Sequence, residues 1–260
     1  MSNQTIDPII AGSTTQVSRF AGGLIDLLDR VEYSRVRMDV TDNPVYRLRY
    51  EAYRREEFVP FNDSGTVVDD LDGTPNANCY GIHIDGELAS SIRIHHVTPA
   101  QRKGPSMKSF PDVLSPLLDE QQTFIDPSRF TADYEASLAF PALPFLTLRI
   151  AVMATEHFDT TACLALVRPE HSAFYRRVFG SVQLADAREY PGLAFPVVLC
   201  SSNSAINLQQ IYRRYPFFRS TAEEREQLFS QTDLRGFQHP LPATAREAFE
   251  LATAAGVAAE

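Results

Sequence analysis

Residues 78–97 carry the stretch NCYGIHIDGELASSIRIHHV, which decides how the sheet of this protein begins. Two strand-like runs, NCYGIHI and ELASSIRIHHV, flank the dipeptide Asp85-Gly86. This dipeptide is the one that best fits a tight turn between antiparallel strands. The stretch therefore predicts a β-hairpin, and the rest of the fold is built outward from it.

Upstream of the hairpin, the pattern indicates a helix, a strand and a second helix. Residues 17–31 place apolar side chains at helical spacing, which is typical of an appended N-terminal helix. Apolar side chains alternate over residues 33–40 and predict a strand. Asn43-Pro44 then supplies an N-cap and a first helical residue, so we expect a helix that continues to about Phe58.

Downstream, residues 122–130 read QTFIDPSRF. This pattern predicts a strand that is interrupted at Pro127, where the missing N–H donor forces a bulge or a sheet edge. Residues 144–158 predict a helix. The uniformly apolar run TACLALV, at residues 161–167, predicts a central strand that is buried on both faces beside parallel neighbours.

The last part of the chain predicts a short helix, one more strand and a helical tail. Residues 169–179 begin with Pro and are followed by Gly180, the two residues that start and end helices. The run LAFPVVLC at residues 193–200 predicts a strand. From about residue 207 the pattern is helical and charged, with an Ala-rich last helix from about residue 243.

The order strand, helix, hairpin, strand, helix, strand, helix, strand predicts an α/β fold with a mixed sheet. Its first half is expected to be antiparallel and its central pair parallel. We expect an N-terminal helical extension over residues 1–32, a central domain over 33–205 and a C-terminal helical extension over 206–260. A chain of 260 residues with 44% hydrophobic residues is long enough for one well-filled core.

Composition excludes several classes of function. The formal net charge of -9 argues against nucleic acid as the main partner, because phosphate binding needs a basic face. The three cysteines lie far apart in apolar stretches and predict buried free thiols. The six histidines show no metal-ligand spacing, so we expect no metal site. The N-terminus lacks a signal-peptide pattern and no long apolar run follows, so we expect a cytoplasmic protein without a membrane span.

Four motifs in order resemble those of the acyl-homoserine-lactone (autoinducer) synthases and the N-acyl amino acid synthases. They are RLRYEAY, DDLDGTPNANCYGI, SSIRI and FIDPSRF. The resemblance covers roughly residues 33–202 and implies the GNAT fold, in which two central strands splay apart. It also implies an acyltransferase whose acceptor-binding residues are Arg49, Tyr53, Asp69, Asp72, Arg93 and Arg129. The segments RPEHSAFYRRVFG and YPGLAFPVVL look like N-acyl amino acid synthases in particular.

Three functions remain open. The favoured one is transfer of a long-chain acyl group to the amine of an amino acid or a similar small acceptor. The first alternative is an autoinducer synthase acting on S-adenosylmethionine. Two features disfavour it: the sequence has no Trp, and it has Asp at position 126, where the autoinducer pattern has Glu. The second alternative is a catalytically silent GNAT module that binds an acyl chain or a partner.

An amine that attacks a thioester needs a base for the ammonium and a way to release the thiolate. Asp126 is our candidate for the base, acting through a water, because a carboxylate in a partly dry strand can have a raised pKa. A bulge-stabilising Asp is the alternative interpretation. His171 is the backup base. Tyr175 resembles the tyrosine that many GNAT enzymes direct at the leaving sulfur, and a simple packing role is the alternative interpretation.

Charges of alternating sign gather at one end of the predicted sheet. A charge that is buried alone costs several kcal/mol, so these side chains must pair with one another or face a site. We expect an acceptor-binding network in which an Arg holds an amino acid carboxylate bidentately. A purely structural ion network is the alternative.

The donor is inferred from a missing motif. Coenzyme A users of this fold resemble one another in a glycine-rich loop, whereas residues 131–145, TADYEASLAFPALPF, have no glycine and two prolines. We therefore expect acyl carrier protein as donor and no further cofactor. Basic residues that would dock its acidic helix are Arg102, Lys103, Lys108, Arg176, Arg177, Arg213 and Arg214. The apolar run FPALPFLTLRIAVMA would line an acyl tunnel or simply fill the core.

Overall fold

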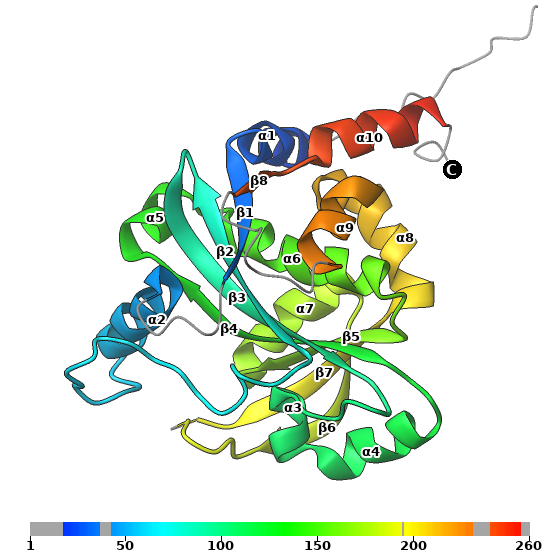
Figure 1. Ribbon diagram of the computed structural model, residues 1–260. Helices are drawn as coiled ribbons and strands as arrows, with labels where there is room; N and C mark the ends of the chain where they lie inside the picture. Colours follow the sequence, from blue (N-terminus) through cyan, green and yellow to red (C-terminus); the bar gives the residue numbers. More distant parts are fainter. Residues whose placement is uncertain (1–17, 37–42, 194, 231–239, 256–260) are drawn as a thin grey trace, which may run out of the picture.

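The computed structural model describes residues 18–36, 43–193, 195–230 and 240–255. Eight strands of this part form one sheet in the order β6-β7-β5-β4-β3-β2-β1-β8 (Figure 1). Of these strands, only β4 and β5 run parallel, and the other neighbouring pairs are antiparallel. The predicted α/β fold with a mixed sheet is confirmed. The strands are β1 (Val31–Val36), β2 (Ala77–Ile84), β3 (Glu87–Val97), β4 (Phe124–Ala132), β5 (Ala162–Val167), β6 (Val182–Arg188), β7 (Val197–Asn203) and β8 (Leu241–Pro242).

The predicted hairpin is formed by β2 and β3. Ile84 lies opposite Glu87, so the loop consists of Asp85 and Gly86 alone. Their φ angles are 52° and 85°, the left-handed values that a two-residue hairpin turn requires. The turn therefore sets the register of the first half of the sheet.

The sheet opens between β4 and β5. Their pairing is limited to Phe124 with Ala162 and Ile125 with Cys163, after which β4 continues along β3 alone. The strand that was predicted to break at Pro127 runs through this residue. Its bulge lies two residues later, at Arg129, whose φ is 54°. The two central strands thus diverge at the middle of the sheet.

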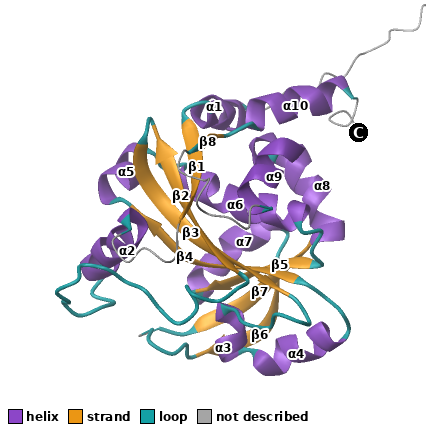
Figure 2. Cartoon of the chain, viewed as in Figure 1, coloured by secondary structure: helices purple, strands orange, loops and turns teal. Residues whose placement is uncertain are grey.

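Helices cover both faces of the sheet (Figure 2). Adjacent residues of β4 show this, because Phe124 packs in the core with α3 and α4 and Ile125 packs in the larger core with α6. One layer holds α2 (Pro44–Arg55), α3 (Pro105–Ser109) and α4 (Pro111–Asp119). The larger core holds α1 (Arg19–Leu28), α5 (Tyr134–Ala139), α6 (Leu143–His157), α7 (Ser172–Phe179), α8 (Ser204–Arg214), α9 (Ala222–Phe229) and α10 (Ala245–Ala254).

The terminal segments pack onto this larger core. α1 and α10 contact each other and the 3₁₀ turn η2 (Pro216–Phe218), while β8 extends the sheet beside β1. Arg149 of α6 ties the C-terminal region down, because its guanidinium lies 2.6 Å from the Glu224 carboxylate and donates to the carbonyl of Phe217. No helix among the described residues is long and apolar enough to cross a membrane.

Several predicted elements differ in detail. β5 is parallel to β4 but antiparallel to β7, so the expectation of parallel neighbours on both sides was wrong. β6 was not predicted, because its side chains lie largely exposed at the sheet edge and show no apolar alternation. α2 ends at Arg55 rather than at residue 58, and the strand predicted over 33–40 is described only to Val36, with residues 37–40 outside the described part.

Candidate active site

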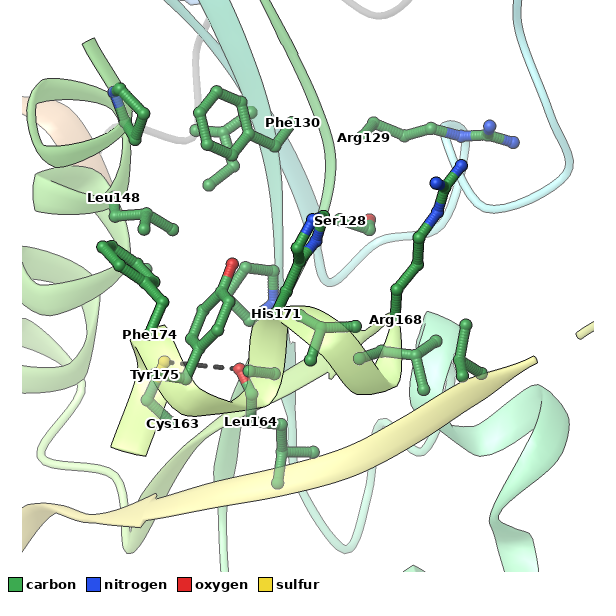
Figure 3. A pocket seen from close by; sticks show the side chains of 18 of the residues that line it. Ser128, Arg129, Phe130, Leu148, Cys163, Leu164, Arg168, His171, Phe174 and Tyr175 are labelled. Atoms are coloured by element: carbon green, nitrogen blue, oxygen red, sulfur yellow. Dashed lines mark hydrogen bonds between the residues drawn. The ribbon is translucent and has the colours of Figure 1, made fainter. Parts of the chain in front are cut away.

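A cavity of about 820 Å³ lies where β4 and β5 diverge. Its apolar wall is formed by side chains of α6, α7 and α8, among them Leu148, Phe174 and Leu208. Tyr53 of α2 and Phe195 of the loop before β7 line another part of it. Mostly apolar cavities of roughly 300–1,000 Å³ with a few polar groups are typical ligand sites. Figure 3 shows this cavity with Tyr175 and His171 of the segment that follows β5 pointing into it.

Five of the six predicted acceptor-binding residues form one ion network, and the sixth, Tyr53, packs against it. Asp72 accepts two hydrogen bonds from Arg49, of 2.9 and 3.0 Å. Arg93 lies between the two aspartates, 2.5 Å from Asp69 and 2.8 Å from Asp72. Arg129 donates through Nε to Asp69 at 3.0 Å, and its guanidinium lies 5.5 Å from the centre of the Tyr53 ring.

Only part of this network reaches the cavity. Arg49 and Arg93 are buried and paired with carboxylates, whereas Tyr53 and Arg129 line the cavity. Burial opposes the ionisation of Asp69, but hydrogen bonds and charges from Arg93 and Arg129 outweigh it and hold its pKa well below the usual range. The network therefore fixes the position of Arg129 at the wall.

Asp126 points away from the cavity. Its two carboxylate oxygens accept hydrogen bonds from the backbone N–H and the hydroxyl of Ser106, of 2.8 and 2.7 Å. Burial raises the pKa of Asp126 to about 6, although the Ser106 hydrogen bonds and the charge of Arg93 oppose the shift. A Cβ at Gly104 would lie 2.8 Å from this carboxylate, so the close approach requires glycine. The following residues of β4, from Pro127 to Phe130, line the cavity and Asp126 does not.

Tyr175 and His171 both line the cavity and lie four residues apart, on one side of the same helical segment. The 3₁₀ turn η1 (Pro169–His171) leads directly into α7, which ends at Gly180 with a left-handed φ of 64°. Burial raises the pKa of Tyr175 to about 12, so its hydroxyl holds its proton at neutral pH. The two residues expected to transfer protons therefore line the same cavity.

The predicted docking residues fall into two groups on opposite faces of the sheet. On the face of α3, Arg102 and Lys108 form ion pairs with Asp119 and Asp70, and Lys103 is exposed. On the other face, the last turns of α7 and α8 lie side by side and carry Arg176, Arg177, Arg213 and Arg214. All four are exposed, and none forms an ion pair within the described residues.

The structure adds residues that the sequence did not single out. Glu56, Ser128 and Arg168 line the cavity together with Arg129 and His171. The signal available for Arg168 was its position directly after a buried apolar strand, where a charge faces the end of the sheet. In the described part of the chain, no group of three or more His, Cys, Asp or Glu side chains is placed to hold a metal ion.

Two solved structures share this architecture. FeeM, described as an N-acyl amino acid synthase from uncultured soil microbes, is 17% identical over 70% of this chain and 94% of its own, with a TM-score of 0.55. BjaI, described as a coenzyme A-dependent acyl-homoserine lactone synthase, is 11% identical over 85% of this chain and 99% of its own, with a TM-score of 0.52. The fold, with its cavity between splayed strands, is that of the GNAT-like acyltransferases.

A family model described as N-acyl amino acid synthase FeeM matches residues 44–203. The chain belongs to this family, and it is an acyltransferase of the N-acyl amino acid or acyl-homoserine lactone synthase type. The match spans α2 to β7 and so contains every strand that borders the cavity. No curated protein sequence matches the chain.

Proposed function

We propose that this protein transfers a long-chain acyl group from the thioester of acyl carrier protein to the amine of an amino acid. The observation that carries the proposal is the cavity between β4 and β5, which combines an apolar wall with the charged side chains of Glu56, Arg129 and Arg168. These three side chains are partly or fully exposed, and the part of the cavity that they line is called its mouth. An acyl chain matches the apolar wall, and a small charged acceptor matches the mouth. The tyrosine expected to serve the leaving sulfur lines the same cavity.

In the reaction, the amine nitrogen attacks the thioester carbon, the carbon–sulfur bond breaks and the sulfur leaves as a thiolate. The nitrogen gives up a proton and the thiolate receives one. We assign proton removal to His171 and proton donation to Tyr175, because both line the cavity. The bulge residues Arg129 and Phe130 also line the cavity, so their backbone N–H groups are candidates to stabilise the oxyanion.

Asp126, the base expected from the sequence, takes a supporting role in this proposal. Both of its oxygens are engaged by Ser106 at the start of α3, and it lies behind the cavity wall. Removing its charge should therefore change the rate less than removing the His171 imidazole. A general acid or base contributes roughly 10²–10⁴-fold to the rate, which makes the two variants distinguishable.

The choice of donor is supported by two features. α6 begins at Leu143 with Pro144 in its first turn and without a glycine-rich loop before it, which removes the backbone donors that would cradle a pyrophosphate. The four exposed arginines at the ends of α7 and α8 lie on the two helices that supply the apolar wall of the cavity. Such a basic surface suits the acidic helix of a carrier protein.

The test is a purified reaction with dodecanoyl- and hexadecanoyl-acyl carrier protein, the twenty amino acids and S-adenosylmethionine, analysed by mass spectrometry. We expect N-acyl amino acids and a requirement for Tyr175. An acyl-homoserine lactone as the main product would replace this proposal with the autoinducer synthase alternative. Absence of any acylated amine with every donor would favour the catalytically silent alternative.

A further inference from the structure

Arg168 directly follows β5 and lines the mouth of the cavity. Its guanidinium carbon lies 3.8 Å from the centre of the Phe195 ring and 5.3 Å from that of Phe58. In Figure 3 the side chain extends toward Arg129, on the same side as His171. Two aromatic rings from different loops thus hold one cationic side chain in place.

The ion pairing of Arg168 differs from that of the fully buried Arg49 and Arg149. Arg49 has a carboxylate at 2.9 Å and Arg149 has one at 2.6 Å. Among the described residues, the carboxylate that pairs with Arg168 is that of the exposed Glu170, at 3.9 Å, although the Arg168 side chain is only 32% exposed. A guanidinium that is mostly withdrawn from water and lacks a close carboxylate retains its donors for an anion from solution.

The two rings also restrict the orientation of the guanidinium. Stacking on aromatic faces stabilises the planar cation and leaves its edge free to donate hydrogen bonds. A planar edge of parallel N–H groups matches a carboxylate bidentately. Because the group is already ordered, less side-chain entropy is lost when the anion binds.

The neighbouring charges define which kind of anion fits. Arg129 shares the Asp69 carboxylate with Arg93 and already donates to it, whereas the carboxylate that pairs with Arg168 lies 3.9 Å away. Glu56 lines the same mouth and forms no ion pair with any described residue, and its charge complements an ammonium group. Arg168 suits the carboxylate of a ligand, and Glu56 suits its ammonium group. The two side chains together therefore match a zwitterion.

We propose that Arg168, packed against the rings of Phe58 and Phe195, binds the carboxylate of the amino acid acceptor and makes the enzyme select amino acids over simple amines. This inference rests on the proposed function, since it names the recognition element of the acceptor. Arg168 lies three and seven residues before His171 and Tyr175, beside the groups assigned to the chemistry. The phosphate of a pantetheine arm lies at the opposite end of the arm from the thioester, so the acceptor carboxylate fits this position better.

The experiment measures binding and does not depend on turnover. The probes are N-dodecanoylglycine, which presents an acyl chain and a carboxylate, and N-dodecanoylglycinamide, which is neutral at the same position. Both are titrated calorimetrically at pH 8 into the full-length protein and into R168Q, R168K and R30Q. Arg30 is the matched control, because it also pairs with a carboxylate, that of Asp85, and lies over an aromatic ring, that of Phe140, but does not line the cavity.

We expect the unaltered protein and R30Q to bind the acid about 10- to 100-fold more tightly than the amide, as a charge-assisted hydrogen-bonded pair allows. R168Q should bind both probes with the affinity of the amide, and R168K should keep part of the preference. Equal binding of acid and amide by the unaltered protein, or a preference that survives in R168Q, would overturn the inference.

Two further measurements distinguish acceptor binding from donor binding and from failure of the proposed reaction. If R168Q weakens binding of 4′-phosphopantetheine but not of pantetheine, and leaves the acid preference unchanged, Arg168 serves the donor phosphate and the inference is wrong. Failure of the proposed function has a different signature, because the acid preference and its loss in R168Q would persist in a protein that forms no acylated product.

Discussion

The buried carboxyl of Asp126 makes the stability of this protein depend on pH in a direction that can be worked out. Burial raises its pKa from 3.8 to about 6. Below pH 3.8 the group is neutral in the folded and the unfolded chain, and its contribution to stability is fully present. Between pH 3.8 and 6 the unfolded chain has lost the proton that the folded chain retains, so stability falls as pH rises. Above the folded pKa of about 6 the loss levels off.

The size of the loss follows from the two pKa values. Each pKa unit corresponds to about 1.4 kcal/mol, so ionising Asp126 in the folded protein costs about 3 kcal/mol in total. About 2 kcal/mol of this falls between about pH 4.5 and 7.5. Asn at this position is neutral at every pH and lacks this contribution to the pH dependence. The free energy of unfolding of D126N, relative to that of the unaltered protein, should therefore rise by about 2 kcal/mol over this range.

Urea denaturation of both proteins at half-unit steps from about pH 4.5 to 7.5 measures this difference, and the contributions of groups common to both proteins cancel. Ser106→Ala supplies an independent check that keeps the carboxyl in place. Loss of the hydroxyl that donates to Asp126 removes an interaction that lowers its pKa, so the fall in stability should extend to higher pH. Parallel stability profiles for D126N and the unaltered protein would refute the reasoning.

The remaining predictions concern the reaction, the docking surface and the C-terminal region. Replacing His171 by Gln should lower kcat/KM by about 10²- to 10³-fold, and Tyr175→Phe should lower kcat, whereas circular dichroism spectra should stay unchanged. Changing Arg176 and Arg213 to Glu should raise KM for acyl carrier protein but not for acyl-pantetheine, and added salt should reduce the difference between variant and parent. Glu224→Gln leaves the Arg149 charge buried without its carboxylate, so unfolding free energy should fall by about 3–5 kcal/mol, as measured with urea.

Local signals were sufficient for much of the fold. Asp85-Gly86 defined a turn because few residue pairs adopt two positive φ angles, and Asn43-Pro44 capped a helix because the Asn43 side chain accepts the Val45 N–H. β5 was recognised as central because a strand covered on both faces is uniformly apolar. Each of these signals depends on residues that are near one another in the chain.

The features of the sheet that were predicted wrongly or missed depend on residues that are distant from one another in the chain. β6 is an exposed edge strand whose order comes from hydrogen bonds to β7, and nothing in its own side chains requires that pairing. The direction of β7 relative to β5 likewise depends on how the intervening chain returns to the sheet. Both features are set by partners distant in sequence, which periodicity does not report.

The residues of the candidate site also fall into those that the sequence identified and those that only the tertiary structure placed. The sequence by itself determined that the chain carries the motifs of an acyltransferase and that Arg49, Asp72, Arg93 and their neighbours would gather, because unpaired buried charges are too costly. Only the tertiary structure decided which of them reach the cavity. Asp126 faces Ser106, and Arg168 lines the cavity beside Phe58 and Phe195. The physical reason is that strand register and the divergence of β4 from β5 choose the face to which each side chain points, and both arise from long-range pairing.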